Sequence, residues 1–506
     1  MSESRRPARR RALKISLPAL ALAATVGGAA PPRPAAAQSL PLSLPGALLL
    51  ALERSPELRV ERLTAEAQAT LAEEARAAFD PSVSASVSHG ESRQPTSARQ
   101  QALEVPGTGV RRGRDDQAKI ELVQPLPTGT ELTVGAESAR NRTNFSPEEY
   151  GSRLALGVTQ PLLRGLRPEA NLAGVRRAEN REIAGRHAFH AAVEGFVAGV
   201  EGAYWDLAFA RQALEVRRQS LDASRRLLAD TEALVAAGRR PAVELAGARA
   251  EVAAREEALE DARGALEAAR LDLVRRLGPG SDLPWSAQIE PVDRPEPPAA
   301  PGDPAPWVQQ ALLRRPDLLQ ARLELANGEL DVAETRDGLL PRLDFSATYA
   351  RSGRDTNLGG TWSQVTDKNY DDWRVGLTWQ HTLGRRAEGA RARRAEFSRQ
   401  RAEGAVENLA LVIQAQVRRA AVDLDRLRRK VDLAEVTARA RAEEAKAERA
   451  RFDAGRATAS DVLQAESRQR EAELNWHRAR SDARQAETEF LRVQGRLAEA
   501  RGIHVF

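Results

Sequence analysis

The chain has 506 residues, no cysteine, 29% charged residues and a formal net charge of +5. The absence of cysteine excludes disulfides, thiol chemistry and a lipid anchor on an N-terminal cysteine. Residues 1–37 hold seven basic residues and one acidic residue, so the rest of the chain is nearly neutral and we expect no binding to nucleic acid.

The first 37 residues are predicted to be a secretory signal peptide. A basic start is followed by the apolar stretch Ile15–Val26 and by the small-residue exit Ala35–Ala37. About 12 apolar residues are too few for a transmembrane helix. No later stretch is long and apolar enough either, so this sequence can enter a membrane only as a β-barrel.

Residues 38–277 are expected to form a first repeat, in which helices lead into strands and then into a long helical hairpin. Leu44–Phe79 is predicted as two helices separated at Pro56. Alternating segments at about residues 82–160 predict four strands: Ser82–His89, Gln117–Val123, Thr130–Ala136 and Arg153–Thr159. A helical hairpin follows over 168–277, with its turn at Gly238–Pro241.

A proline-rich linker, residues 278–306, precedes a second repeat over 307–500. Nine prolines in this linker exclude a helix or a central strand. In the second repeat Pro316 again separates two helices, and two strands, Leu343–Arg351 and Trp373–Gln380, lie within about 342–381. The second helical hairpin covers 385–500, with its last helix predicted over 459–500, and residues 501–506 form a C-terminal tail.

The two halves of the chain share an internal sequence repeat. Ala51–Pro81 aligns without a gap to Ala311–Pro341 at a constant offset of 260 residues, and both prolines are retained. Gly238 and Gly455, at the two hairpin turns, correspond at an offset of 217. A fixed offset of this kind indicates a duplicated structural unit.

The strands of the second repeat have one apolar, aromatic face and one polar face. Phe345 and Tyr349 lie on the first face of one strand, and Trp373 and Trp379 on that of the next. A membrane barrel with a wet lumen has this pattern, with aromatic girdles at both interfaces. A soluble sandwich with one buried face is the alternative, because its strands alternate in the same way.

Six predicted strands are too few for a membrane barrel, which needs at least eight. The barrel would therefore be shared among chains. Three chains would give twelve strands if each contributes four, or eighteen if each contributes six. The sequence leaves both open, because the turn at Pro125–Gly129 is also compatible with a hairpin that packs elsewhere.

The chain resembles the TolC-type outer-membrane efflux proteins, also called outer membrane factors. Four motifs carry the resemblance: TQPLLRG at Thr159–Gly165, AYWDL at Ala203–Leu207, FDAG at Phe452–Gly455 and DVLQA at Asp461–Ala465. The second repeat departs from the first motif, since Thr378–Gly384 reads TWQHTLG. The motif therefore does not define the residue at which the long helix of the second repeat begins.

The resemblance implies an α+β membrane protein that forms a homotrimer. A transmembrane β-barrel shared between the chains would lie in outer-membrane lipid and continue into a long α-helical coiled-coil tunnel in the periplasm. The partners would be a periplasmic adaptor and an inner-membrane pump of the RND or ABC type. Such a channel is not an enzyme and needs neither a cofactor nor a metal.

By the same resemblance, the two hairpin turns would dock the adaptor, and a gate would close the tunnel near them. The docking residues would be Gly238, Arg239, Arg240, Pro241, Gly455, Arg456 and Thr458. The gate candidates are Arg451, Asp453 and Asp461, and the membrane-facing aromatics are Phe345, Tyr349, Trp373 and Trp379. The plainer interpretations are ordinary helix turns and solvated helix faces.

Two other functions fit parts of the sequence. A periplasmic adaptor also contains helical hairpins, but usually one hairpin with small β-domains and an anchor. A secreted coiled-coil scaffold without a pore would leave the alternating aromatic strands unexplained.

Overall fold

The computed structural model describes residues 39–95, 110–144, 146–239, 241–368 and 370–504. The predicted signal peptide lies outside these residues. The described chain forms two compact units, each assembled from both halves of the sequence. The sheet unit comprises Glu66–Ala184 and Ala321–Val406, and the helical unit contains the residues before it, between its segments and after it.

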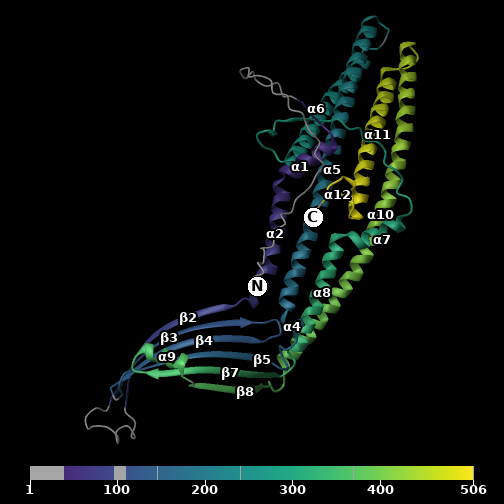
Figure 1. The fold of residues 1–506 in the computed structure, drawn as a ribbon. Coiled ribbons are helices and arrows are strands. Elements are labelled where there is room, and N and C mark those ends of the chain that lie inside the picture. Colours follow the sequence, from purple (N-terminus) through teal and green to yellow (C-terminus); the bar gives the residue numbers. More distant parts are fainter. Residues whose placement is uncertain (1–38, 96–109, 145, 240, 369, 505–506) are drawn as a thin grey trace, which may run out of the picture. The chain divides into compact units, whose positions relative to one another are not determined.

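The sheet unit is built around six antiparallel strands in the order β2-β3-β4-β5-β7-β8 (Figure 1). The strands are β2 (Ser82–Pro95), β3 (Val110–Pro125), β4 (Glu131–Thr143), β5 (Glu149–Pro161), β7 (Arg342–Asp355) and β8 (Asp371–Gln380). Each predicted strand lies within one of these, apart from Thr130, which precedes β4. The turn after Pro125 connects β3 to β4 inside the sheet, so this hairpin does not pack elsewhere.

Two of the helical segments in this unit contact each other through ion pairs. They are the start of α5 (Ala173–Ala236), which follows the short α4 (Pro168–Asn171), and the second half of α8 (Pro316–Asp337). Arg177 of α5 lies 2.6 Å from both Asp331 and Glu334 of α8. Ion pairs therefore connect α5, which follows the strands of the first repeat, to α8, which precedes the strands of the second repeat.

The helical unit contains two helical hairpins. The first joins α5 to α6 (Val243–Leu277), and the second joins α10 (Arg386–Asp453) to α11 (Ala459–Val493) (Figure 1). The first helices of the chain are α1 (Leu44–Arg54) and α2 (Pro56–Arg76), which leads into the 3-10 turn η1 (Ala77–Phe79), while α7 (Pro304–Arg314) precedes α8 in the second half. Pro56 and Pro316 each open the second helix of a pair, where the missing N–H costs nothing.

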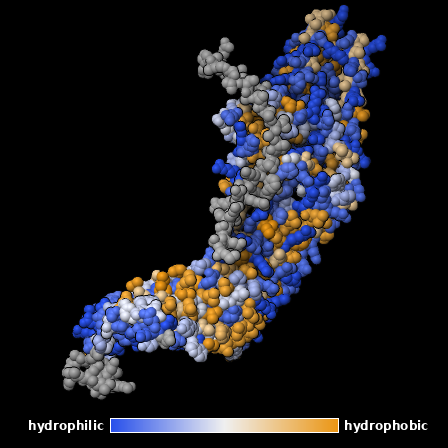
Figure 2. All heavy atoms as spheres, in the orientation of Figure 1, coloured by the Kyte–Doolittle hydropathy of each residue, from blue (hydrophilic) through white to orange (hydrophobic). Residues whose placement is uncertain are grey.

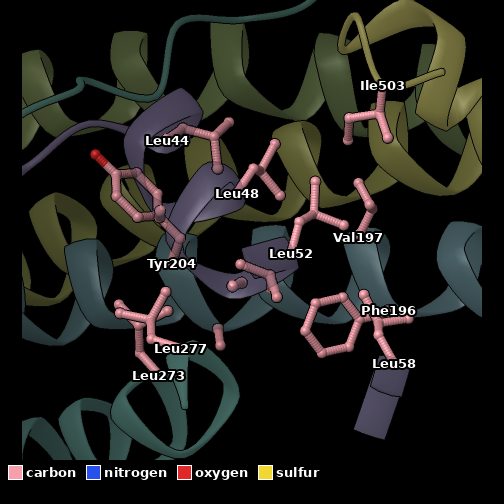
Figure 3. Close-up of a cluster of buried hydrophobic side chains, with 14 of the residues drawn as sticks. Leu44, Leu48, Leu52, Leu58, Phe196, Val197, Tyr204, Leu273, Leu277 and Ile503 are labelled. Carbon is pink, nitrogen blue, oxygen red and sulfur yellow. The ribbon is translucent and has the colours of Figure 1, made fainter. Parts of the chain in front are cut away.

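The largest hydrophobic core of the helical unit forms where α1 packs against α5 and α6. Leu44, Leu48 and Leu52 are spaced four residues apart on one face of α1 and are buried. Figure 3 shows them among Phe196, Val197 and Tyr204 of α5, Leu273 and Leu277 of α6, and Ile503 near the C-terminus. Each such side chain contributes roughly 1.5–3 kcal/mol on burial.

The residues of the AYWDL motif connect α5 to three distant segments. The Tyr204 hydroxyl oxygen lies within hydrogen-bond distance of two acceptors, the backbone oxygen of Leu42 at 3.0 Å and the Asp293 carboxylate at 2.8 Å. The backbone oxygen of Trp205 accepts from Ser481 of α11 at 3.1 Å, and Asp206 accepts from Gln485 at 3.0 Å. The motif therefore joins the two halves of the chain inside one unit.

The predicted linker contains a short edge strand and the start of a helix, in addition to extended chain. Within it β6 (Gln288–Pro291) pairs in parallel with β1 (Ser39–Leu42), and each is an edge strand of this two-stranded sheet, where proline is tolerated. At its end, α7 begins at Pro304, three residues before the predicted start of the second repeat at 307, because Asp303 caps it by accepting from the Ala305 N–H at 3.0 Å.

Two further helix predictions need correction. The last helix was expected to run to residue 500, but α11 ends at Val493, because Gly495 has a φ of 67° and closes the helix, and the short α12 (Leu497–Ala500) follows. The expected helix over 168–237 is interrupted at Leu172, between α4 and α5. Among the described helices, none combines the length with the apolar character that crossing a bilayer requires.

Candidate functional site

One face of the six-stranded sheet carries an apolar row that crosses every strand. The paired residues Val83, Leu122, Val134, Leu156, Tyr349 and Trp373 form this row. All six are exposed, including Trp373 at 75%. In Figure 2 hydrophobic residues gather on the part of the sheet near its connections to helices, and hydrophilic residues cover the opposite end.

The four aromatic residues predicted to face the membrane all lie on this apolar face. Tyr349 is paired with Trp373, Phe345 with Leu377, and Trp379 with Leu343. Trp373 and Trp379 are six positions apart, which corresponds to ~20 Å along a strand. Their arrangement fits two girdles at the edges of a hydrophobic band, and their contact with lipid stays a prediction.

The opposite face of the sheet is polar and carries ion pairs between strands and along them. Arg153 of β5 reaches across β7 to Asp372 of β8, with an Nη2–Oδ2 distance of 2.9 Å. On β3, Lys119 lies 2.9 Å from Glu121. A face of this kind needs water, whereas the apolar face does not, so the two sides of the sheet suit different solvents.

A short helix, α9 (Leu358–Asp367), covers the apolar face at the end far from the helices. It contacts β5 and β7, and Thr361 and Ser152 lie 2.6 Å apart through their hydroxyl oxygens. Trp362 donates from Nε1 to the Ser138 hydroxyl at 3.1 Å. The sequence analysis did not predict this helix, although Asn357 provides an N-cap by accepting from the Gly360 N–H.

Both hairpin turns begin with the same backbone structure. Gly238 has a φ of 69°, its N–H donates to the oxygen of Val235 at 2.9 Å, and the next N–H, of Arg239, donates to Leu234 at 2.9 Å. Gly455 has a φ of 72° and makes the corresponding bond to Phe452 at 2.9 Å, and Arg456 donates to Arg451 at 2.7 Å. Each turn is thus a Schellman motif with glycine at the left-handed position.

Of the other residues predicted to dock a partner, Pro241 and Thr458 continue these turns, and Arg240 lies outside the described residues. Pro241 precedes α6, where its backbone oxygen accepts from the Glu244 N–H at 3.1 Å. Thr458 is the N-cap of α11 and forms a capping box with Asp461. Their role in docking stays a prediction.

The three gate candidates lie near the second turn and make different contacts. Arg451 pairs with Glu448 at 2.7 Å, and Asp453 lies 3.4 Å from Arg449, which also pairs with Asp230 of α5. Asp461 accepts from the Thr458 backbone N–H at 2.8 Å and from its hydroxyl at 2.7 Å. These bonds hold the pKa of Asp461 below its usual value, so it stays ionised under mildly acidic conditions.

Arg451 and Asp461 also line one charged hollow between α10 and α11. Its other charged lining residues are Glu444, Glu448, Arg456 and Arg468. Asp453 is not part of it. The structure therefore brings two of the three predicted gate residues together, in a single chain, and ties the third to α5 through Arg449.

The sequence profile of the outer membrane efflux protein family matches residues 47–279 and 307–496. The chain belongs to this family. The two matched segments leave out the proline-rich linker and cover both hairpins and all six strands of the sheet. Family membership places the protein in the outer membrane, with an extension into the periplasm.

Relatives of this efflux protein include two curated proteins with 28% identity. Multidrug resistance outer membrane protein MdtP of Escherichia coli strain K12 matches over 256 residues, which are 47% of this chain and 51% of MdtP. Protein CyaE of Bordetella pertussis strain Tohama I matches over 322 residues, which are 61% of this chain and 63% of CyaE. The chain thus spans about half to two thirds of these relatives.

The fold of this family member is also that of solved outer-membrane channels. The Campylobacter jejuni CmeC outer membrane channel superposes with a TM-score of 0.68 and 15% identity, covering 90% of this chain and 86% of CmeC. This likeness confirms the TolC-type α+β fold expected from the sequence motifs.

Proposed function

We propose that this protein is the outer-membrane channel of a tripartite efflux or type I secretion system. It forms a homotrimer, whose shared β-barrel opens into a periplasmic tunnel of helical hairpins. Substrates delivered by an inner-membrane pump, of the RND or ABC type, pass through it by way of a periplasmic adaptor. The channel itself catalyses no reaction and is passive.

The apolar row across all six strands is the observation that carries this proposal. Large apolar side chains cover one face of the sheet and are exposed, for example Trp379 at 65% and Val87 at 85%. Moving each such side chain from water into lipid is favourable by roughly 1.5–3 kcal/mol. The polar face, with Arg153 and Asp372, would line a water-filled lumen.

The sheet cannot function in a membrane as an isolated monomer. Within the described residues, β2 and β8 are the ends of the strand order and each pairs with a single neighbour. In lipid an unpaired backbone polar group costs several kcal/mol, so an open sheet edge is not tolerated there. Assembly of several chains removes these edges and encloses the polar face.

The hairpin turns are the surfaces proposed for adaptor docking. Each presents a glycine and an arginine at the end of a long helix, and the charged hollow beside the second turn is lined by Arg451, Arg456 and Asp461. The gate is proposed near this hollow, where three copies of these charged residues would converge. Salt would weaken such contacts, because they are exposed.

Native mass and bilayer recordings test this function. Mature protein purified in detergent should have the mass of three chains and should produce discrete current steps in a planar bilayer. A monomer or dimer without current would contradict the channel and favour an adaptor or scaffold. A matched preparation of heat-denatured protein controls for current caused by detergent.

A further inference from the structure

The geometry points to a barrel of eighteen strands, closed by pairing of β8 of one chain with β2 of a second copy. This inference rests on the proposed trimer and adds which strands form the barrel and which edges meet. The alternative is a twelve-stranded barrel made from β4, β5, β7 and β8 only, with the β2–β3 hairpin outside it.

The two edges have the polarity that closure requires. The sheet is antiparallel throughout and has an even number of strands, so β2 and β8 run in opposite directions. Joining β8 to β2 of the next copy continues the antiparallel order without exception. Three copies then give eighteen strands, an even number as in bacterial outer-membrane barrels.

The apolar band is present on both edge strands at the same height. On β2 it consists of Val83, Ala85 and Val87, which alternate with serines. On β8 it consists of Trp373, Val375, Leu377 and Trp379. The apolar row that runs from Val83 on β2 to Trp373 on β8 shows that the apolar residues of both edge strands lie on the same face of the sheet. A β8–β2 junction would therefore make the apolar band continuous around the barrel.

The registers within the sheet supply the stagger that a barrel needs. At the end near the helices, β3 extends two residues beyond β2, β5 two beyond β4, and β7 two beyond β5, whereas the pairs β3–β4 and β7–β8 end level. All three offsets have the same direction. The stagger is the shift along the strands that accumulates from β2 of one chain to β2 of the next. It is six residues if Ser82 of the next copy pairs with Gln380, and eight residues if Ser84 of the next copy pairs with Gln380.

This stagger agrees with the tilt of strands in membranes. With a rise of ~3.3 Å per residue and a strand spacing of ~4.75 Å, six residues per six strands correspond to a tilt of ~35°, and eight to ~43°. Strands of outer-membrane barrels tilt by about 35–45°. Both registers keep the apolar residues outward, because the shift is even.

The pairing of β3 with β4 decides between eighteen and twelve strands. In a twelve-stranded barrel, β4 would pair with β5 on one side and with β8 of a neighbour on the other. The pairing observed with β3, from Glu131 to Thr143 along the whole of β4, would have to be broken. Closure through β2 keeps every observed strand pair. An eighteen-stranded barrel is ~35 Å across at the backbone, compared with ~24 Å for twelve strands.

Engineered disulfides test the junction, because the chain has no cysteine of its own. Four double variants share Leu377→Cys on β8. The second change is Ala85→Cys or Val87→Cys for the two registers of the eighteen-stranded barrel, Val134→Cys for the twelve-stranded barrel, and Phe345→Cys as the control within one chain. Phe345 is paired with Leu377 in the structure.

After oxidation in outer membranes, we expect Ala85→Cys or Val87→Cys to give a ladder of cross-linked dimers and trimers on non-reducing gels. The Phe345→Cys control should be oxidised but remain at the monomer position. A ladder from Val134→Cys, or no ladder while the control pair is oxidised, would overturn the eighteen-stranded barrel. The reduced variants are also tested for trimer mass and current, and failure there would count against the channel itself.

Discussion

The carboxylate of Glu201, in the middle of α5, forms a two-pronged ion pair with Arg501 near the C-terminus. The distances are 2.6 Å from Nε to Oε1 and 3.0 Å from Nη2 to Oε2. Glu201 is completely buried and also accepts from the Thr488 hydroxyl of α11. Three segments that are distant in sequence therefore meet at one buried charge.

Removal of Arg501 should destabilise the helical unit strongly. Arg501→Ala leaves the buried Glu201 carboxylate without its counter-charge, which costs about 3–5 kcal/mol. Thermal unfolding followed by circular dichroism should show the loss. The control is Arg426→Ala, since Arg426 forms an exposed pair with Asp423 and its loss should cost less than about 1 kcal/mol. A double variant, Arg501→Ala with Glu201→Gln, should be more stable than Arg501→Ala alone; equal or lower stability would contradict this explanation.

Glu194 should make the stability of the helical unit depend on pH. Its carboxylate accepts from the backbone N–H groups of Leu497 and Ala498 at 3.2 Å, and burial raises its pKa to about 7. Because the folded state binds the proton more tightly than the unfolded state, stability falls as pH rises from about 4.5 to about 7, by on the order of 3 kcal/mol.

Glu194→Gln tests this dependence. The amide cannot ionise, so the difference in unfolding free energy between variant and wild type should shift in favour of the variant as pH rises through this interval, and should level off above it. Melting curves at pH 4.5, 6, 7 and 8 measure the difference. A difference that stays constant over this range would show that Glu194 does not titrate there.

The hairpin turns illustrate what could be predicted from sequence. Gly238 and Gly455 were located correctly, because a glycine that ends a long periodic segment signals a helix end. The capping box of Thr458 and Asp461 was also readable, since a threonine followed three residues later by an acid marks a helix start. Instead, Asp461 was interpreted as the first residue of the DVLQA motif and as a gate candidate.

Other parts of the fold were beyond local sequence signals. The pairing of β1 with β6 joins two four-residue segments whose partners lie far apart in the chain, so no periodicity reveals it. The outer halves of β2 and β3 were missed because both faces are polar there, as in Glu91–Gln94 and Arg111–Asp116. Alternation is lost in such segments, although their backbone pairing continues.

The left-handed glycines at the turns should tolerate no side chain. Gly455→Ala places a Cβ at a φ of 72°, which costs roughly 1–2 kcal/mol and should open the last turn of α10. Hydrogen exchange of the amides of Gly455 and Arg456 should accelerate by about fivefold or more. In Gly247→Ala, within α6, the new Cβ meets no other atom within 4 Å, so the helix should become more stable by about 0.5–1 kcal/mol. Unchanged exchange in Gly455→Ala would contradict the Schellman assignment.

The proposed channel requires that the apolar face of the sheet contacts lipid and the polar face contacts water. Single nitroxide labels, placed at each position from Trp373 to Gln380 in protein reconstituted into liposomes, report which solvent each position contacts. We expect accessibility to alternate with a period of two. Residues 373, 375, 377 and 379 should be accessible to oxygen dissolved in lipid, and residues 374, 376, 378 and 380 to a water-soluble nickel reagent. Access of the nickel reagent to all eight positions would contradict it.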